Sequence, residues 1–124
     1  MNTNLVGYVI CAWFPEQAHL MLPGSKFRPC LVVDVDPASN KILLAYGTSQ
    51  QTERQDRGQF TIKQSELPSL RKDTKFSMNT PLWVPMTTEF LSRNPSELHV
   101  QVVGQVPRSV AARLVRALEE VSRR

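Results

Sequence analysis

Cysteine is scarce in this chain, and none of the cysteine patterns that bind metals or build disulfide frameworks is present. The two cysteines among the 124 residues, Cys11 and Cys30, each lie in an apolar run, where a free thiol behaves as a small hydrophobic group. The sequence leaves open whether a single disulfide joins them. A disulfide scaffold and a structural zinc site are not indicated, because there is no Cys-x-x-Cys pair and no His-rich tract. We expect a reducing compartment and neither a metal ion nor a cofactor.

Long hydrophobic runs are also lacking. No segment reaches the length of a membrane span, and Met1-Asn2-Thr3-Asn4 is not a basic region followed by an apolar stretch. The sequence therefore predicts a cytoplasmic protein without a membrane partner. With 124 residues, 41% of them hydrophobic, the chain has the size and the apolar content of one domain, which we expect to span residues 1–124.

The charge balance is basic. Fifteen lysines and arginines against eleven aspartates and glutamates give a formal net charge of +4 and a pI near 9.4. This excess favours association with polyanions without establishing it. Part of it is explained by a cluster near the C-terminus, which suits the solvated face of a helix: Arg108, Arg113, Arg116, Arg123 and Arg124.

Short apolar runs separated by turn residues predict a fold rich in strands. The expected strands are 5–14, 30–35, 41–46, 59–62, 74–77, 82–86 and 99–103. Pro37-Ala38-Ser39-Asn40 predicts a hairpin between the second and the third of these, and a short helix is expected to begin at Thr87, with threonine as its N-cap. Together with a C-terminal helix, these strands predict an α+β, mainly-β fold with a closed or half-closed sheet, that is, a small barrel.

The final helix is expected to be amphipathic, with Ser109 as its N-cap. Its apolar face is predicted to hold Val110, Leu114, Leu118 and Val121, while the residues turned away are Arg113, Arg116, Glu120 and Arg124. Exposed ion pairs at the spacing of one helical turn are expected for Glu119 with Arg123 and Glu120 with Arg124. Trp13 and Trp83 lie in apolar strands and are predicted to be core residues, and His99 is predicted to be structural.

Two long segments interrupt the strands and are candidate functional loops: the connection from Pro15 to Phe27, which carries the turn residues Pro23-Gly24-Ser25, and the almost wholly polar stretch from Thr48 to Gly58. Arg28 opens the second strand and Thr48 closes the third. Because a hairpin makes these strands antiparallel, both residues fall at the same end of the sheet and face one pocket. A guanidinium beside hydroxyls and loop amides suits a phosphate, since the arginine fork donates paired hydrogen bonds.

This pattern resembles the PemK/MazF family of toxins. The likeness is carried by Gly7 to Phe14, by Arg28-Pro29-Cys30-Leu31-Val32-Val33 and by Thr48-Ser49-Gln50. The second half of the chain agrees only in layout, with a strand, Gly104 and a terminal helix. The resemblance implies an SH3-like barrel of the PemK/MazF/CcdB type that forms a homodimer and is held inactive by a cognate antitoxin.

The resemblance also implies the activity of a sequence-specific endoribonuclease that needs no metal ion. In that reaction the ribose 2′-hydroxyl attacks the adjacent phosphate of single-stranded RNA and leaves a 2′,3′-cyclic phosphate and a 5′-hydroxyl. The catalytic arginine and threonine of the family match Arg28 and Thr48 here. Arginine stays charged near neutral pH, so Arg28 is assigned to the charge that grows on the phosphorane, and Thr48 to a non-bridging oxygen.

Further candidates for catalysis or RNA binding are Ser49 and Gln50 beside Thr48, Lys26 near Arg28, and His19 as a general base. Six cations form either a groove that follows the phosphates or scattered solubility charges: Lys26, Arg54, Arg57, Arg71, Lys72 and Lys75. The alternative from another class is a non-catalytic, toxin-like barrel that binds RNA or a protein target such as gyrase. Fold likeness does not separate the two, because function depends on the site.

Overall fold

The computed structural model of the chain describes residues 5–94 and 96–122. Its strands are β1 (Tyr8–Trp13), β2 (Phe27–Asp36), β3 (Lys41–Thr48), β4 (Gln59–Ile62), β5 (Thr74–Ser77), β6 (Leu82–Pro85) and β7 (Val102–Gln105). Its helices are α1 (Thr88–Leu91), the 3-10 turn η1 (Arg108–Val110) and α2 (Ala111–Ser122). The predicted mainly-β fold with a C-terminal helix is thereby confirmed.

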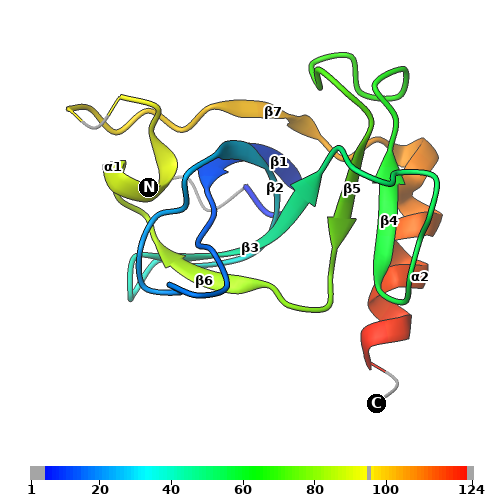
Figure 1. Cartoon of the computed structure of the whole chain (residues 1–124), viewed down its shortest axis with the longest axis horizontal. Helices are drawn as coiled ribbons and strands as arrows, with labels where there is room; N and C mark the ends of the chain where they lie inside the picture. The colour runs from blue at the N-terminus through cyan, green and yellow to red at the C-terminus, as the bar shows by residue number, and fades with distance from the viewer. Residues whose placement is uncertain (1–4, 95, 123–124) are drawn as a thin grey trace.

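The seven strands form one antiparallel sheet in the order β4-β5-β3-β2-β1-β7, with β6 also paired to β3. Strand β3 is shared, because its first residues, from Lys41 to Leu44, pair with β6, whereas Gly47 and Thr48 pair with β5. This division of one strand between two partners lets the sheet curl strongly into a half-barrel (Figure 1). The first strand, β1, lies inside the sheet, between β2 and the last strand, β7, which forms one edge.

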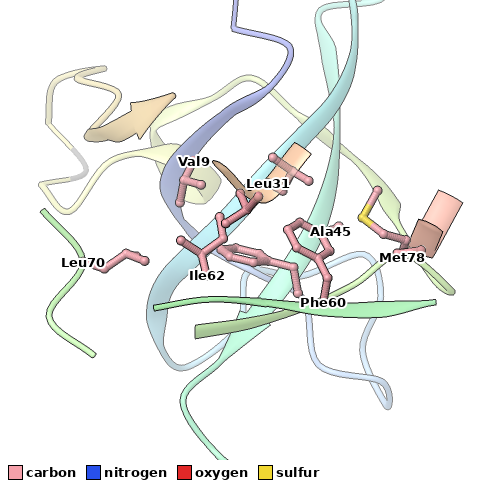
Figure 2. Close-up of a cluster of buried hydrophobic side chains, with 10 residues drawn as sticks. Val9, Leu31, Ala45, Phe60, Ile62, Leu70 and Met78 are labelled. Carbon is pink, nitrogen blue, oxygen red and sulfur yellow. The ribbon is translucent and has the colours of Figure 1, made fainter. Parts of the chain in front are cut away.

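Both faces of the central strands β1, β2 and β3 are buried, which explains why they read as nearly continuous apolar runs. One face packs against β4, β5 and α2, and Figure 2 shows Val9, Leu31, Ala45, Phe60 and Ile62 of this cluster pointing toward one another. The alternate residues of the same strands pack on the other side against β6 and α1. The hairpin turn between β2 and β3 ends at Asn40, whose φ of 55° is a left-handed conformation that asparagine tolerates.

Helix α2 lies alongside β4 (Figure 1). The buried face of α2 differs in part from the predicted one, because Leu118 is 40% exposed while Ala117 is fully buried in the core. Arg113 and Arg116, which were predicted to turn away, donate hydrogen bonds to the carbonyl oxygens of Thr61 and Gln59. The apolar stripe is thus centred nearer the arginines than expected, and their guanidinium groups dock the helix onto the strand.

Glu120 also faces β4, because its carboxylate accepts a hydrogen bond from the backbone N–H of Gly58 at 2.7 Å. The predicted cap of the helix was wrong, since Ser109 lies inside η1 and Pro107 precedes it. The helix instead continues directly from the 3-10 turn. Arg123 and Arg124, with the ion pairs expected for them, lie outside the described residues.

An ion pair joins α2 to the segment between β4 and β5. The Nη1 and Nη2 atoms of Arg113 donate to the two carboxylate oxygens of Glu66 at 2.7 and 2.8 Å, a two-pronged geometry that is stronger than a single contact. The Arg113 hydrogen bonds hold the pKa of Glu66 below its ordinary value. The carboxylate therefore stabilises the fold at neutral pH.

Replacing Glu66 by Gln is expected to lower the free energy of unfolding by about 0.5 to 1 kcal/mol near neutral pH, the range of a partly exposed pair. Since the folded-state pKa is the lower one, this contribution is present above the pKa of the unfolded chain and is lost as the pH falls through the folded-state value. Denaturant titrations near pH 7 and about pH 3 should show the difference at the first pH and much less at the second. Glu53→Gln, at an exposed loop position, is the control. An equal loss at both pH values would contradict the ionic origin.

Other expectations also needed correction. Strand β7 begins at Val102, and His99 lies before it in an exposed segment. Trp83 is 45% exposed on β6 and is not a core residue, whereas Trp13 is half-buried and donates from Nε1 to the carbonyl of Ser92. Thr87 precedes α1 but forms no side-chain cap.

The thiols of Cys11 and Cys30 are both free and buried, so no disulfide joins them. In the described part of the chain, no helix has the length and apolar character needed to cross a membrane.

Candidate anion-binding site

The β2–β3 hairpin brings Arg28 and Thr48 to one end of the sheet, as predicted. In this hairpin Cys30 lies opposite Tyr46, so the same antiparallel register, continued two residues toward this end, places Arg28 opposite Thr48. Both residues line one pocket of about 630 Å³, which we call the cation pocket. Lys26, Ser49 and Gln50 line it too, so five of the six candidate site residues lie together.

The cation pocket is strongly basic. Five cationic side chains line it: Lys26, Arg28, Arg71, Lys72 and Arg93. They come from three separate stretches of chain, namely the start of β2 with the residue before it, the β4–β5 segment and the residues after α1. Within residues 5–94 and 96–122, none of the five forms an ion pair. Like charges held together without local counterions make a site that attracts a polyanion.

Aromatic rings lie beside two of these guanidinium groups. The Cζ atom of Arg28 is 5.6 Å from the centre of the Tyr46 ring, and that of Arg93 is 4.8 Å from the centre of the Phe27 ring. Both distances are within the range of cation–π attraction, which holds the guanidinium without consuming its N–H donors. The donors of Arg28 and Arg93 are thus available to a ligand.

Thr48 ends β3 and its hydroxyl has a defined hydrogen bond. Its Oγ1 accepts from the backbone N–H of Gln50 at 3.2 Å, a local turn typical of threonine. Because a hydroxyl can accept and donate at once, the O–H hydrogen of Thr48 remains able to donate to an oxygen bound in the pocket. Gly47, just before it, has no room for a side chain, since a Cβ there would lie 2.7 Å from the carbonyl oxygen of Pro29.

The loop after Thr48 is exposed, as predicted, and side chains of β4 and β5 hold it in place through hydrogen bonds. Lys75 of β5 is 6% exposed, and its ammonium donates to the carbonyls of Gln51 and Arg54 at 3.0 and 2.8 Å. The hydroxyl of Thr61 donates to the carbonyl of Thr52. Lys75 therefore fixes the position of the loop that carries Ser49 and Gln50.

Several predicted candidates lie elsewhere. His19 is exposed in the β1–β2 loop and does not line the cation pocket. Arg54 pairs with Asp56, and Arg57 donates to the carbonyl of Glu120, so neither lines the pocket. Lys75 is buried under the loop, so Lys26, Arg71 and Lys72 are the residues of the suggested groove that line the site.

Arg93 and Tyr46 line the pocket without having been predicted. Arg93 is distant in sequence from the other four cations of the pocket, and no local pattern around it points to a ligand. Tyr46 is the one aromatic residue of the apolar strand β3. The alternation of side chains along a strand was the one signal from which its place in the pocket could have been predicted.

Side chains that transfer protons near neutral pH are absent from the pocket lining. Among the described residues that line it there is no aspartate, glutamate or histidine. Cys11 lies at the wall, and burial raises the pKa of its thiol despite the opposing charges of Arg93 and Arg71, so it stays protonated. Across the described residues, no group of three or more His, Cys, Asp or Glu side chains has an arrangement that could hold a metal ion.

The pocket combines cations, hydroxyls and loop amides at one end of the sheet, and such a set suits an anion. No protein-family model and no curated protein matches this chain. The argument for function therefore depends on the site itself.

Proposed function

We propose that the protein binds single-stranded RNA through the cation pocket and cleaves it by attack of a ribose 2′-hydroxyl on the adjacent phosphate. The observation that carries the proposal is the joint presence of Arg28 and Thr48 in a pocket with four further cations and, among the residues that the structure describes, no acidic side chain in its lining. An RNA phosphate bound there meets a fork of guanidinium donors and a hydroxyl donor. The resemblance to PemK/MazF toxins supports the same pair as catalytic.

In the reaction, the 2′-oxygen forms a bond to phosphorus while the bond from phosphorus to the 5′-oxygen breaks. The products are a 2′,3′-cyclic phosphate and a 5′-hydroxyl. Arg28 stabilises the negative charge that grows on the non-bridging oxygens, and Thr48 donates to one of them. Since the described lining offers no carboxylate or imidazole, we assign the removal of the 2′-proton and the protonation of the leaving 5′-oxygen to water.

The test is incubation of the purified protein with a long single-stranded RNA in excess EDTA, followed by mapping of the ends. Cleavage is expected to persist, because charge stabilisation comes from side chains, and the fragments should carry cyclic phosphate and 5′-hydroxyl ends. A substrate with 2′-O-methyl riboses is the matched control and should stay intact. Cleavage that needs added magnesium, or 5′-phosphate ends, would refute the mechanism.

Binding without cleavage is the second candidate, and one observation favours it. The cations and hydroxyls of the pocket suit a phosphate, yet its described lining supplies no general base. In that case the 2′-O-methyl RNA and the unmodified RNA bind equally and neither is cut. The same experiment therefore separates a ribonuclease from an RNA-binding barrel.

A second copy of the chain and a cognate antitoxin are the protein partners in this proposal. The β1–β2 loop exposes Leu20, Met21 and Leu22, with Met21 at 88%, and so offers apolar surface for a partner. Sedimentation velocity at micromolar concentration is expected to give the mass of two 14.1 kDa chains. A single species at the mass of one chain would contradict the dimer.

A further inference from the structure

A second pocket adjoins the cation pocket and shares a wall with it. This pocket, of about 580 Å³, lies between the β1–β2 loop and strands β3 and β6, and we call it the aromatic pocket. Arg28 and Tyr46 line both pockets. On its own side the aromatic pocket is lined by the apolar groups of Phe14, Leu20 and Leu82.

Two rings give this pocket its shape. The rings of Phe14 and Tyr46 lie 5.5 Å apart and are tilted by 37° to each other. The Arg28 guanidinium also lies against the Tyr46 ring, with its Cζ atom 5.6 Å from the ring centre. A flat, apolar ligand with a π-face fits beside such rings, and nucleobases stack on aromatic side chains in this way.

The aromatic pocket, unlike the cation pocket, has a negatively charged side chain in its described lining. Glu16 is the one acidic residue among the described residues that line either pocket. Its Oε2 accepts from the backbone N–H of Ser25 at 3.2 Å, and its Oε1 has no protein donor within residues 5–94 and 96–122. A carboxylate repels a phosphate and accepts from an amino group, so it favours a base edge at this place.

We propose that the aromatic pocket binds the base of the nucleotide whose phosphate lies in the cation pocket, and that it selects bases with an exocyclic amino group over uracil. The inference rests on the proposed function, because the phosphate fixes which side of Arg28 the base occupies. In a nucleotide, base and phosphate are joined through one ribose. Two pockets divided by a single wall of Arg28 and Tyr46 match that connection.

The experiment measures binding by fluorescence anisotropy with labelled 2′-O-methyl oligonucleotides, which cannot be cleaved. Oligo(C) and oligo(U) of equal length form a matched pair that differs in the amino group, and an abasic backbone of that length reports the phosphates alone. Oligo(C) is expected to bind about ten-fold more tightly than oligo(U), a difference in line with base recognition in single-strand binders, and the abasic backbone most weakly.

Variants assign the effect to the pocket. Phe14→Leu, at a ring that lines the aromatic pocket but not the cation pocket, is expected to weaken the binding of oligo(C) by about ten-fold through lost stacking while leaving that of the abasic backbone unchanged. Glu16→Gln keeps the shape of the side chain and should remove the preference for oligo(C) over oligo(U). Trp83→Leu, which alters an exposed ring outside both pockets, is the control.

The outcomes separate the two proposals. Equal binding of oligo(C) and oligo(U), or an abasic backbone that binds as tightly as oligo(C), would overturn the base pocket while the phosphate site stands. Loss of binding for oligo(C) with Trp83→Leu but not with Phe14→Leu would also overturn it. Failure of all three ligands to bind would overturn the proposed function itself.

Discussion

Arg28→Ala is expected to cut the rate of RNA cleavage by about a hundred- to a thousand-fold, the usual cost of losing one preorganised donor to a transition-state charge. The fold should be nearly unaffected, because Arg28 is half-buried at the start of β2 and, in the described part of the chain, its guanidinium contacts a ring face and no carboxylate. Truncation removes packing of the stem and little else. Cleavage rate and melting temperature, measured on the same preparation, check both expectations.

Arg28→Lys tests whether geometry or charge alone matters. Lysine keeps the positive charge but loses the planar fork, so a site that uses two parallel hydrogen bonds stays impaired. Arg108→Ala removes an exposed arginine from η1, outside the pocket, and is the matched control. His19→Ala should also keep the wild-type rate, since His19 lies outside the pocket. A folded Arg28→Ala protein that cuts RNA at the wild-type rate would remove the basis of the nuclease assignment.

Lys75→Met should damage stability and activity together. The substitution keeps the length of the stem but removes the ammonium that donates to two loop carbonyls. Loss of hydrogen bonds from a charged, buried donor costs about 1.5 to 3 kcal/mol of unfolding free energy. The loop that carries Ser49 and Gln50 then loses the hydrogen bonds that hold it. Misplacement of these residues in the pocket lowers the cleavage rate by about ten- to a hundred-fold.

The readouts for Lys75 are denaturant titration, cleavage rate and proteolysis within residues 49–58. Lys41→Met is the matched control, because Lys41 is exposed at the opposite end of the shared strand β3. If Lys75→Met alters the melting temperature without altering either the rate or the proteolysis of the loop, Lys75 stabilises the fold and does not position the loop.

The sequence predicted the sheet well where strands are short and bounded by turn residues. The bounds of β4 and β5 match the expected strands, and the hairpin ending at Asn40 follows from its turn residues. That hairpin also made the neighbourhood of Arg28 and Thr48 predictable, because antiparallel pairing is a local consequence of a short turn. Everything near the site that depends on this pairing was accessible from the sequence.

Contacts between distant segments were not accessible. Arg93 joins the pocket only because α1 and the residues after it fold back over β1, and Lys75 is buried because a loop more than 20 residues earlier folds over it. On α2, hydrophobic periodicity placed Arg113 on the wrong face, since a long side chain can leave the apolar stripe and still reach a strand carbonyl. The residue pattern of a single helix or strand carries no information about contacts with such distant segments.

The pairing of β1 with β7 constrains when the protein becomes functional during its synthesis. Val9 pairs with Gly104, and the cation pocket includes Gln101 and Val103 from this final part of the sheet. A ribosome adds about 5 to 20 residues per second, so the first strand waits several seconds for its last partner. The nascent chain therefore carries a complete β2–β3 hairpin long before it has a complete pocket.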